Sequence, residues 1–168
     1  MSRVHYGDVV SVLIGEAKSC VAGEGFYSDT LNACPNNFAH SDAKVALFEI
    51  TTRHTYQARN RLQAALLEHQ FDLGTPREEV LKQLHDHATV SATLLYREYD
   101  DELAQNASEE KQSRGKEVCY GDIIQFRHLV SGKMITFTQQ VALFDSLCEA
   151  VMLQDGGPGS WIIMTPRF

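Results

Sequence analysis

The sequence has no apolar run of the length that crosses a bilayer, which takes about 20 consecutive apolar residues. Its first residues, Met1 to Arg3, also lack the apolar stretch of a secretory signal peptide. We therefore expect this chain to be made in the cytosol, and that expectation leaves open a membrane portion beyond Phe168.

Basic residues are scarce, with 15 lysines and arginines against 22 aspartates and glutamates and a net charge of -7 at neutral pH. Binding to a nucleic-acid backbone depends on lysine and arginine side chains that neutralise phosphates. We therefore expect no nucleic-acid partner. At 168 residues the chain suits one domain with a substantial hydrophobic core.

Closely spaced cysteines are absent as well, because Cys20, Cys34, Cys119 and Cys148 form no C-x-x-C pair. Zinc and redox motifs need cysteines at such close spacing. Disulfides are rare in cytosolic proteins. We therefore expect free and mostly buried thiols, with oxidation-sensitive thiols as the alternative.

Motifs for catalysis and cofactor binding are missing too. The sequence contains no G-x-S-x-G segment and no dinucleotide fingerprint, and residues 156–159 lack the lysine and helix of a phosphate-binding loop. His85 and His87 are two residues apart, so a helix would point them to different sides, which disfavours a metal pair. The acidic residues 100–102 lack an EF-hand loop and indicate a solvated face.

These absences predict a protein that is not an enzyme and that needs no metal or cofactor. The alternative is a nucleophilic pair formed by His128 with Cys119 or Cys148, which no motif supports. Nothing in the sequence marks one of these thiols as activated.

The sequence does contain one segment twice. Residues 6–12 (Tyr-Gly-Asp-Val-Val-Ser-Val) reappear as residues 120–126 (Tyr-Gly-Asp-Ile-Ile-Gln-Phe). After a nearly equal interval, each copy ends in a closing apolar strand, residues 46–50 in the first and 160–164 in the second. An internal repeat of about forty residues indicates an architecture built from similar supersecondary units.

Strand signals surround both copies. Residues 8–14 are rich in valine, leucine and isoleucine, and residues 122–129 alternate between apolar and other side chains. Residues 131–133 (Ser-Gly-Lys) predict a tight turn, and therefore a hairpin between residues 126–129 and 134–137. With glycine-rich turns in both copies, the pattern predicts a mainly β fold, either a barrel or a sandwich.

The segment between the copies predicts two antiparallel helices. The first spans roughly residues 54–70. The second begins with Thr75 as N-cap, Pro76 at the first helical position and Glu78 three residues after the cap. An apolar stripe then continues along it to Leu103, either as a docking surface or as the face that packs within the protein.

Residues 108–116 are polar and charged. Such a composition cannot bury enough apolar surface to offset the entropy of ordering. It therefore predicts a mobile surface loop that leads back to the second copy.

The motifs of both copies occur in one known family. Residues 4–12 resemble the start of the inositol 1,4,5-trisphosphate receptors and their ryanodine-receptor relatives. Residues 119–134 look like the Y-G-x-x-I-x-L-x-H-x-x-S-x-K-Y-L pattern of those channels, and residues 159–166 match their G-S-W-x-x-x-x-P. The helical pair, including residues 81–88, resembles the helix-turn-helix arm of the inositol trisphosphate receptor. The resemblance covers essentially the whole chain.

The resemblance implies a β-trefoil head with a helix-turn-helix arm, known in the family as the suppressor domain. Residues 1–51 would form the first trefoil repeat, residues 52–117 the helical arm and its loop, and residues 118–168 the second repeat. A trefoil needs three repeats, and we expect the third after Phe168. Two-thirds of a trefoil leaves strand edges uncovered, so we expect the isolated chain to oligomerise or to be one piece of a larger polypeptide.

The resemblance also implies a regulatory function without chemistry. In the family, this domain lowers the ligand affinity of the adjacent inositol trisphosphate-binding core and couples ligand binding to the opening of a calcium-release pore. The implied partners are that downstream core and the neighbouring subunits of a homo-tetrameric channel. The implied location is the cytosolic face of an intracellular calcium store, the endoplasmic reticulum or an acidic store, with the membrane reached only through the rest of the polypeptide. We expect no inositol phosphate site in this chain.

The resemblance points to Pro166, Arg167 and Phe168 as residues that couple the domains. Phe168 stands where the family has a tyrosine on the loop that contacts the adjacent core. Its ring can preserve packing although the hydroxyl is lost. We expect Phe168→Ala to leave ligand binding intact and to blunt channel opening, the alternative being a residue that only completes the core.

Two other classes of protein stay open on the sequence alone. Trefoil modules that bind carbohydrate, such as those of protein O-mannosyltransferases, have similar short β repeats and would face the secretory lumen. A free-standing cytosolic interaction protein would use its helical stripe as the groove for a partner.

Overall fold

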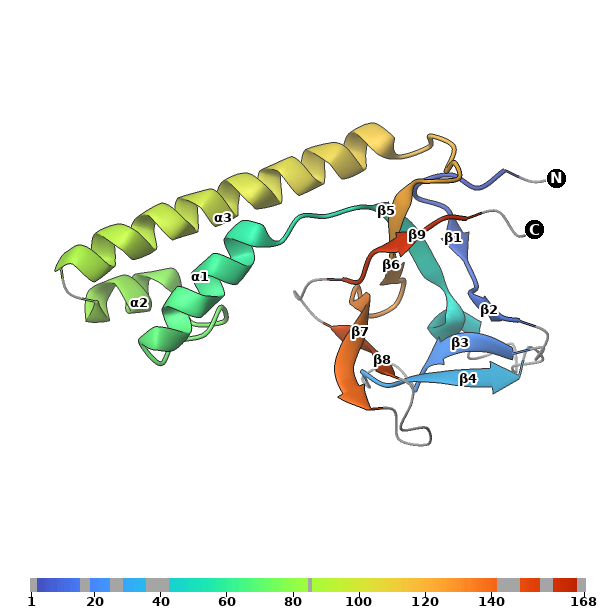
Figure 1. Ribbon diagram of the computed structural model, residues 1–168, viewed down its shortest axis with the longest axis horizontal. Helices are drawn as coiled ribbons and strands as arrows, with labels where there is room; N and C mark the ends of the chain where they lie inside the picture. Colours follow the sequence, from blue (N-terminus) through green and yellow to red (C-terminus); the bar gives the residue numbers. More distant parts are fainter. Residues whose placement is uncertain are drawn as a thin grey trace. The chain divides into compact units, whose positions relative to one another are not determined.

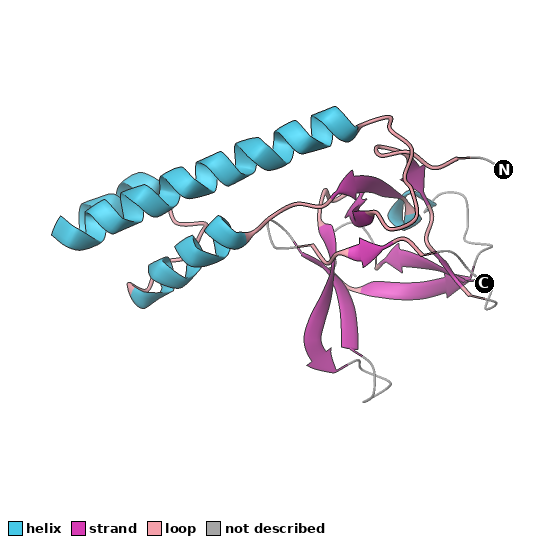
Figure 2. Ribbon diagram, turned by 45° about the horizontal axis from the view of Figure 1, so that its top comes forward, coloured by secondary structure: helices cyan, strands magenta, loops and turns pink. Residues whose placement is uncertain are grey.

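The computed structural model describes residues 3–15, 19–24, 29–35, 43–84, 86–141, 149–154 and 159–165. The chain divides into two compact units. We call residues 1–54 with 110–168 the β unit and residues 55–109 the helical unit. Figure 1 gives the order of the elements, and Figure 2 distinguishes the strands, in magenta, from the helices, in cyan. The prediction of a mainly β chain with a helical insertion is confirmed.

The described part of the β unit is built from nine strands that pair antiparallel. They are β1 (Val9–Val10), β2 (Leu13–Ile14), β3 (Ser19–Gly23), β4 (Leu31–Pro35), β5 (Phe48–Thr52), β6 (Ile123–His128), β7 (Met134–Val141), β8 (Glu149–Gln154) and β9 (Ile162–Ile163). The larger sheet has the order β1-β5-β6-β7-β8, with β9 paired to β6, and the smaller sheet has the order β2-β3-β4. A short 3-10 helix, Ala43–Ala46, precedes β5.

The predicted hairpin between the strands of the second copy is confirmed. β6 and β7 are antiparallel with Arg127 opposite Met134, and the N–H of His128 donates to the C=O of Lys133 at 2.8 Å. Gly132 has a φ of 71°, a left-handed conformation that glycine adopts without steric cost. The Ser-Gly-Lys segment therefore makes the turn that its composition predicts.

The two Tyr-Gly-Asp segments fold into the same turn, residues 5–8 and residues 119–122. In each turn the aspartate N–H donates to the C=O of the first residue, at 3.0 Å in the first copy and 3.1 Å in the second. The aspartate carboxylate accepts the N–H of that first residue at 2.8 Å in both copies. Gly7 and Gly121 have φ of 92° and 96°, which residues with a Cβ rarely adopt. The backbone therefore requires the repeated glycine, and the aspartate side chain fixes the turn.

Each turn is joined to its closing strand by the same two hydrogen bonds. The glycine N–H donates to the C=O of Ile50 in the first copy and of Met164 in the second, both at 2.8 Å. The N–H groups of Ile50 and Met164 donate back to the aspartate C=O, both at 3.0 Å. The partner lies at the same sequence distance from the glycine in both copies. The similarity of sequence is thus also a similarity of backbone pairing.

The Gly-Ser-Trp segment before β9 packs tightly against the larger sheet. Gly159 leaves no room for a side chain, because an added Cβ would lie 2.7 Å from Gln125 Nε2. The same Gln125 Nε2 donates to the C=O of Gly159 at 2.6 Å. Ser160 Oγ accepts the N–H of Phe137 at 2.7 Å. The close approach of Gln125 therefore explains the glycine of this motif, and the hydrogen bond from Phe137 explains its serine.

Two buried clusters fill the β unit. One is centred on Phe48, which is fully buried and meets the ring of Phe126 edge-on, with the ring centroids 6.4 Å apart. The other involves the smaller sheet and the 3-10 helix, and it consists of Cys20, Ala22, Val45 and Ala46. The first cluster also packs against Val21 of β3 and Leu31 of β4, so the two sheets share buried contacts.

Three helices are described between the two copies, α1 (Gln57–Glu68), α2 (Arg77–Gln83) and α3 (Asp86–Ser113). The first predicted helix is confirmed, whereas the second is divided. Leu84 has extended backbone, with φ −80° and ψ 145°, so α2 ends there. Pro76 rather than Thr75 occupies the N-cap position of α2, and Thr75 Oγ1 instead donates to Asp72 Oδ1 at 3.1 Å. Among these helices, a stretch with the length and apolar character of a membrane span does not occur.

The prediction of a mobile loop over residues 108–116 is wrong. α3 continues to Ser113, and the glutamates, lysine and glutamine in this stretch are good helix formers. Beyond the helix, the N–H of Gly115 donates to the C=O of Tyr6 at 2.8 Å, and the N–H of Tyr6 donates to the C=O of Lys116 at 3.0 Å. The polar composition therefore belongs to an exposed helix end followed by paired backbone.

The three helices share one apolar core, and a side chain of α3 caps the start of α1. The core residues are Leu62, Leu66, Val80 and Tyr96. The cap is Glu102, whose carboxylate accepts the N–H groups at positions 58 and 59, in the first turn of α1, at 2.8 and 3.0 Å.

Glu102 corrects the prediction that residues 100–102 only form a solvated face. α1 has no side-chain cap of its own. A helix leaves its first N–H groups unpaired, and a negative charge at that end is favourable. A carboxylate from α3 therefore stabilises the start of α1, while the neighbouring Asp101 is exposed to solvent.

We expect Glu102→Ala to lower the free energy of unfolding by about 1–2 kcal/mol, because the first turn of α1 loses its acceptor. The matched control is Asp101→Ala, which removes an exposed carboxylate from the adjacent position of the same helix. Urea denaturation followed by circular dichroism gives both values. Equal stabilities for the two variants would contradict the assignment of Glu102 as a cap.

Candidate functional site

The predicted coupling residues at 166–168 lie outside the described residues, so their role stays a prediction. Cys148 and His85 also lie outside, as does the side chain of His87. Among the residues that the structure describes, no three histidine, cysteine, aspartate or glutamate side chains are placed to hold a metal ion. The candidate site must therefore come from other side chains.

His128, at the end of β6, has other partners than a cysteine. Its Nδ1 lies 2.8 Å from Ser131 Oγ, and its Nε2 lies 3.1 Å from the Val45 C=O oxygen. Burial lowers the pKa of His128 although the bond to Val45 opposes that shift, so the ring is neutral at neutral pH. Cys119 lies in the turn before β6 and His128 at the far end of that strand, and a strand of six residues is about 16 Å long.

Cys119 is also exposed, whereas Cys20 is buried and Cys34 is half-buried. The prediction of a buried thiol is therefore wrong for Cys119. Its sulfur approaches only the C=O oxygen of Glu117 among its described contacts, at 3.9 Å. The described residues do not bring Cys119 to His128.

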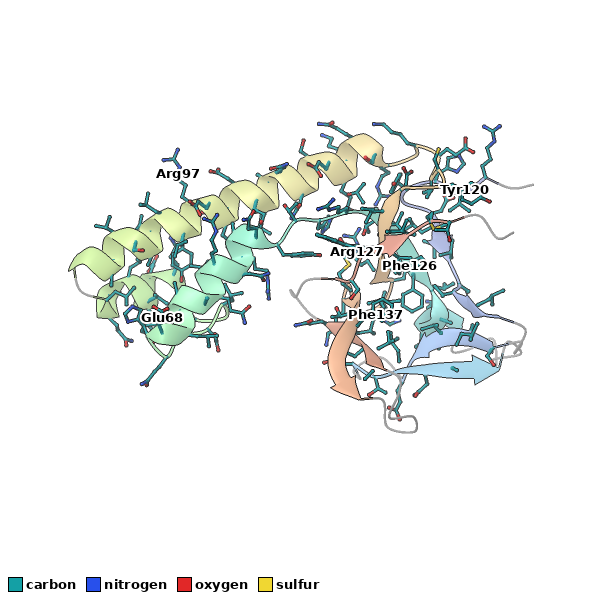
Figure 3. The ribbon with its side chains drawn as sticks, viewed as in Figure 1. Glu68, Arg97, Tyr120, Phe126, Arg127 and Phe137 are labelled. Atoms are coloured by element: carbon teal, nitrogen blue, oxygen red, sulfur yellow. The ribbon has the colours of Figure 1, made fainter. Side chains whose placement is uncertain are left out.

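Five titratable side chains converge where β5, β6 and the last turn of α3 meet. We call them the charge cluster, and they are Glu49, His54, Glu110, Arg114 and Arg127. All five belong to the β unit. Figure 3 labels Arg127 among the side chains of this unit.

Arg127 is the centre of the charge cluster. The register of β5 and β6 places it directly opposite Glu49. Its Nη2 lies 2.8 Å from Glu49 Oε2 and 2.6 Å from Glu110 Oε1, and its Nε lies 3.2 Å from Glu49 Oε2. A guanidinium carries N–H donors in fixed directions and can bind two carboxylates at once. One side chain of β6 therefore connects β5 to α3.

The remaining members extend the cluster at both sides. His54 Nε2 lies 3.3 Å from Glu110 Oε2, and Arg114 forms an ion pair with Glu49. Trp161 Nε1 donates to the C=O of His54 at 3.2 Å. The Gly-Ser-Trp segment of the second copy is therefore connected to the charge cluster through the backbone of His54.

Burial and charge act against each other in this cluster. The side chains of Glu49, Glu110 and Arg127 are 13%, 22% and 27% exposed. Burial alone would raise the pKa of Glu110, but the hydrogen bonds and positive charge of Arg127, with His54 and Arg114, lower it below its ordinary value. Burial opposes the charge of Arg127, and its bonds to Glu110 and Glu49 raise its pKa. Glu110 and Arg127 are therefore both ionised at neutral pH.

The charge cluster is suited to hold position rather than to perform chemistry. Glu110 lies in the last turn of α3, a helix that begins at Asp86 in the helical unit. Removing one partner of a buried ion pair is strongly destabilising, because the other charge is left without compensation. A displacement of the last turn that separated Glu110 from Arg127 would therefore be costly. The cluster can thus make β5 and β6 sensitive to the position of this turn.

A second contact connects the two Tyr-Gly-Asp copies. Tyr6 OH, in the first copy, donates to Asp122 Oδ2 in the second at 3.2 Å. Burial, followed by the negative charge of Asp122, raises the pKa of Tyr6 to about 12, so the hydroxyl keeps its proton. Tyr120, at the matching place in the second copy and labelled in Figure 3, is 72% exposed. The two turns are equivalent, but their tyrosines have different surroundings.

Sequence patterns did not single out the charge cluster. The positions of Glu49 and Arg127 in the repeat could have indicated their pairing. Glu49 lies in the closing strand of the first copy and Arg127 in β6 of the second, and these two strands pair directly. Glu110 carried no such indication, since residues 108–116 read as a loop.

The whole sequence, residues 1–168, matches the model of a family that is described as inositol 1,4,5-trisphosphate/ryanodine receptor. The matched range includes both Tyr-Gly-Asp copies, the three helices and all members of the charge cluster. The match agrees with the resemblance that the repeated motifs indicate.

We expect Glu110→Gln to lower the free energy of unfolding at neutral pH by about 1–3 kcal/mol, because Arg127 loses one of its two carboxylate charges. The control is Glu98→Gln, which breaks the ion pair of Glu98 with Arg61, where both side chains are about half exposed and the pair is worth little. Urea denaturation measures the free energy of unfolding of both variants. An equal loss of stability in the two would contradict the role of burial.

The same variant has an expected pH dependence. The folded pKa of Glu110 is lowered, so its stabilisation is present above the ordinary glutamate pKa of about 4.3 and is lost as pH falls through the folded value. Glu110→Gln removes this loss, and the difference in urea midpoint between wild type and variant should shrink in acid. A difference that stays constant from neutral pH down to about pH 3 would overturn the pKa assignment.

Proposed function

This chain belongs to the inositol 1,4,5-trisphosphate/ryanodine receptor family, and we propose that it is a regulatory domain that couples ligand binding to channel opening. The family is one of calcium-release channels, in which this region is the N-terminal domain. In the proposed role, the chain lowers the ligand affinity of the adjacent inositol trisphosphate-binding core. It also transmits the bound state of that core towards the pore.

The proposed partners are the downstream binding core and the neighbouring subunits of a homo-tetrameric channel. The proposed location is the cytosolic face of an intracellular calcium store, with the membrane contacted by the rest of the channel. Coupling of this kind requires contacts that differ between two states of the assembly. The domain therefore needs a segment whose position depends on contacts with one partner and alters the contacts with another.

The charge cluster is the observation that supports this role. Glu110, on α3, and Glu49, on β5, share the same guanidinium, with Nη2 of Arg127 at 2.6 and 2.8 Å from their oxygens. Both bonds can be kept only while the last turn of α3 stays in place. A partner that moves this turn would thus change the charge balance beside β5 and β6. A partner that binds those strands would in turn shift the position of the last turn of α3.

We further propose that residues 1–51 and 118–168 are two units of a β-trefoil, split by a helical arm of residues 52–117. The identical turns and their equal pairing with the closing strands support two equivalent units. Tyr6 of one unit donates to the aspartate of the next. The exposed Tyr120 is then the side chain that would make the same contact with a third unit.

An apolar groove of about 280 Å³ in the β unit also fits an incomplete trefoil. Its lining includes Ile14, Leu31, Phe126 and Phe137, with Asn32 as a polar member. Apolar surface of this kind is favourable to bury. A third unit is the proposed cover of this groove, and we expect the isolated chain to self-associate through it. Pro166, Arg167 and Phe168 are the proposed residues that couple the chain to the adjacent core.

The proposed function is tested by Arg127→Met in the full-length channel. We expect ligand binding to persist, at equal or higher affinity, while calcium release at a given ligand concentration falls about five-fold or more. The matched control is Arg61→Met, which removes an arginine that is 54% exposed and forms a surface ion pair with Glu98. Ligand binding to microsomes and calcium flux from the same vesicles give both quantities.

Normal calcium release by the Arg127→Met channel would contradict the proposal, as would an equal defect in Arg61→Met. Circular dichroism of the isolated 168-residue variant chain establishes that the domain is folded. If it is not folded, Glu110→Gln replaces it, since glutamine keeps the length and one acceptor oxygen of the glutamate.

A further inference from the structure

Two cysteines lie opposite each other on adjacent strands of the smaller sheet. The register of β3 and β4 places Cys20 directly opposite Cys34, and Figure 1 shows these strands side by side. Both cysteines are free thiols. Residues directly opposite each other on antiparallel strands project to the same face of the sheet, so the two sulfur atoms share one side of the hairpin.

Backbone hydrogen bonds show which kind of pair this is. The N–H of Glu24 donates to the C=O of Thr30 at 3.0 Å, and these residues continue the register of β3 and β4. Hydrogen-bonded pairs recur at every second residue of an antiparallel ladder, so Cys20 and Cys34 also form one. The Cα atoms of such pairs are about 5.5 Å apart, inside the range of about 4.4–6.8 Å that disulfides span.

The geometry of this pair favours a labile bond. Facing Cβ atoms lie about 4.5–5.5 Å apart, and hydrogen-bonded pairs are at the wider end. A relaxed disulfide needs about 3.5–4.5 Å. The two strands must therefore draw slightly together when the bond forms. A bond held under such a constraint is reduced more easily than a relaxed one.

The two thiols differ in access. Cys20 is 4% exposed, within the cluster that includes Val45, and Cys34 is half-buried against the same cluster. Burial raises the pKa of the Cys34 thiol, and the neighbouring Cys20 adds to the shift, which agrees with two thiols close together. A reagent in solution therefore meets Cys34 first and Cys20 only through Cys34.

We propose that Cys20 and Cys34 form a reversible disulfide site that is oxidised by glutathione disulfide. The Cys34 thiolate attacks one sulfur of glutathione disulfide, a mixed disulfide forms, and one glutathione thiolate leaves. The Cys20 thiolate then attacks Cys34 Sγ, the Cys20–Cys34 bond forms, and the second glutathione thiolate leaves. The chain loses two electrons and two protons, and one glutathione disulfide becomes two molecules of glutathione.

The site is independent of the proposed coupling role and acts on a different part of the β unit. The bond would close residues 20–34 into a loop, joining β3 to β4 covalently. A cross-link restricts the unfolded chain and any opening of the hairpin. Reduced and oxidised chains should therefore differ in the exchange of backbone amides in β3 and β4.

The test treats the folded 168-residue chain with glutathione disulfide at about pH 8, where more of a thiol is thiolate. In the Cys119→Ser chain, which lacks the exposed thiol, we expect two of the three remaining thiols to disappear and the chain to lose the mass of two hydrogen atoms. Cleavage after glutamate then gives residues 17–24 and 25–49 as one disulfide-linked product. Excess reduced glutathione should restore both thiols.

Two variants control the assignment. Cys119→Ser removes the exposed thiol and should leave the linked product unchanged. Cys34→Ser should abolish it, and Cys20→Ala serves the same purpose if that variant does not fold. A stable glutathione adduct on Cys34 without the linked product would overturn the proposal. So would a linked product that appears only when the chain is first unfolded in urea.

Discussion

One guanidinium shared by two carboxylates is the interaction on which much of the β unit depends. Without Arg127, the partly buried Glu49 and Glu110 would be left close together with only part of their charge compensated. Repulsion would then favour the release of the last turn of α3. The paired backbone that follows this turn, including the bond from Gly115 to Tyr6, would lose its anchor. The ion pairs of one arginine thus help to hold together segments that are far apart in the sequence.

Repetition and divergence have separate roles in this chain. The Tyr-Gly-Asp turns are equivalent in backbone geometry, since glycine supplies the positive φ and aspartate closes the turn in each. Their surroundings differ, because Tyr6 reaches the aspartate of the other copy while Tyr120 is exposed. The charge cluster likewise pairs a carboxylate of β5, Glu49, with an arginine of β6, Arg127. The repeat builds the scaffold, and the residues that break its symmetry carry the proposed function.

What could be predicted from the sequence was mostly local. Gly132 in its hairpin turn follows from the φ values that only glycine adopts freely, and the two copies could be aligned directly. The end of α3 was missed because a polar and charged composition is typical of a loop, although its glutamates and lysine also favour an exposed helix. Glu102 and Glu110 were missed for another reason, since their partners lie in other elements and no local pattern records such contacts. Long-range side-chain contacts therefore marked the limit of what the sequence could show.

A double-mutant cycle on the last turn of α3 tests the central claim most directly. Amide hydrogen exchange of residues 113–118 would be measured in the wild type, in Glu110→Gln, in Arg127→Met and in the double variant. If Glu110 and Arg127 hold this segment by acting on each other, each single variant loses protection and the double variant loses clearly less than their sum. Strictly additive losses, or unchanged protection in either single variant, would show that the segment is held by something else.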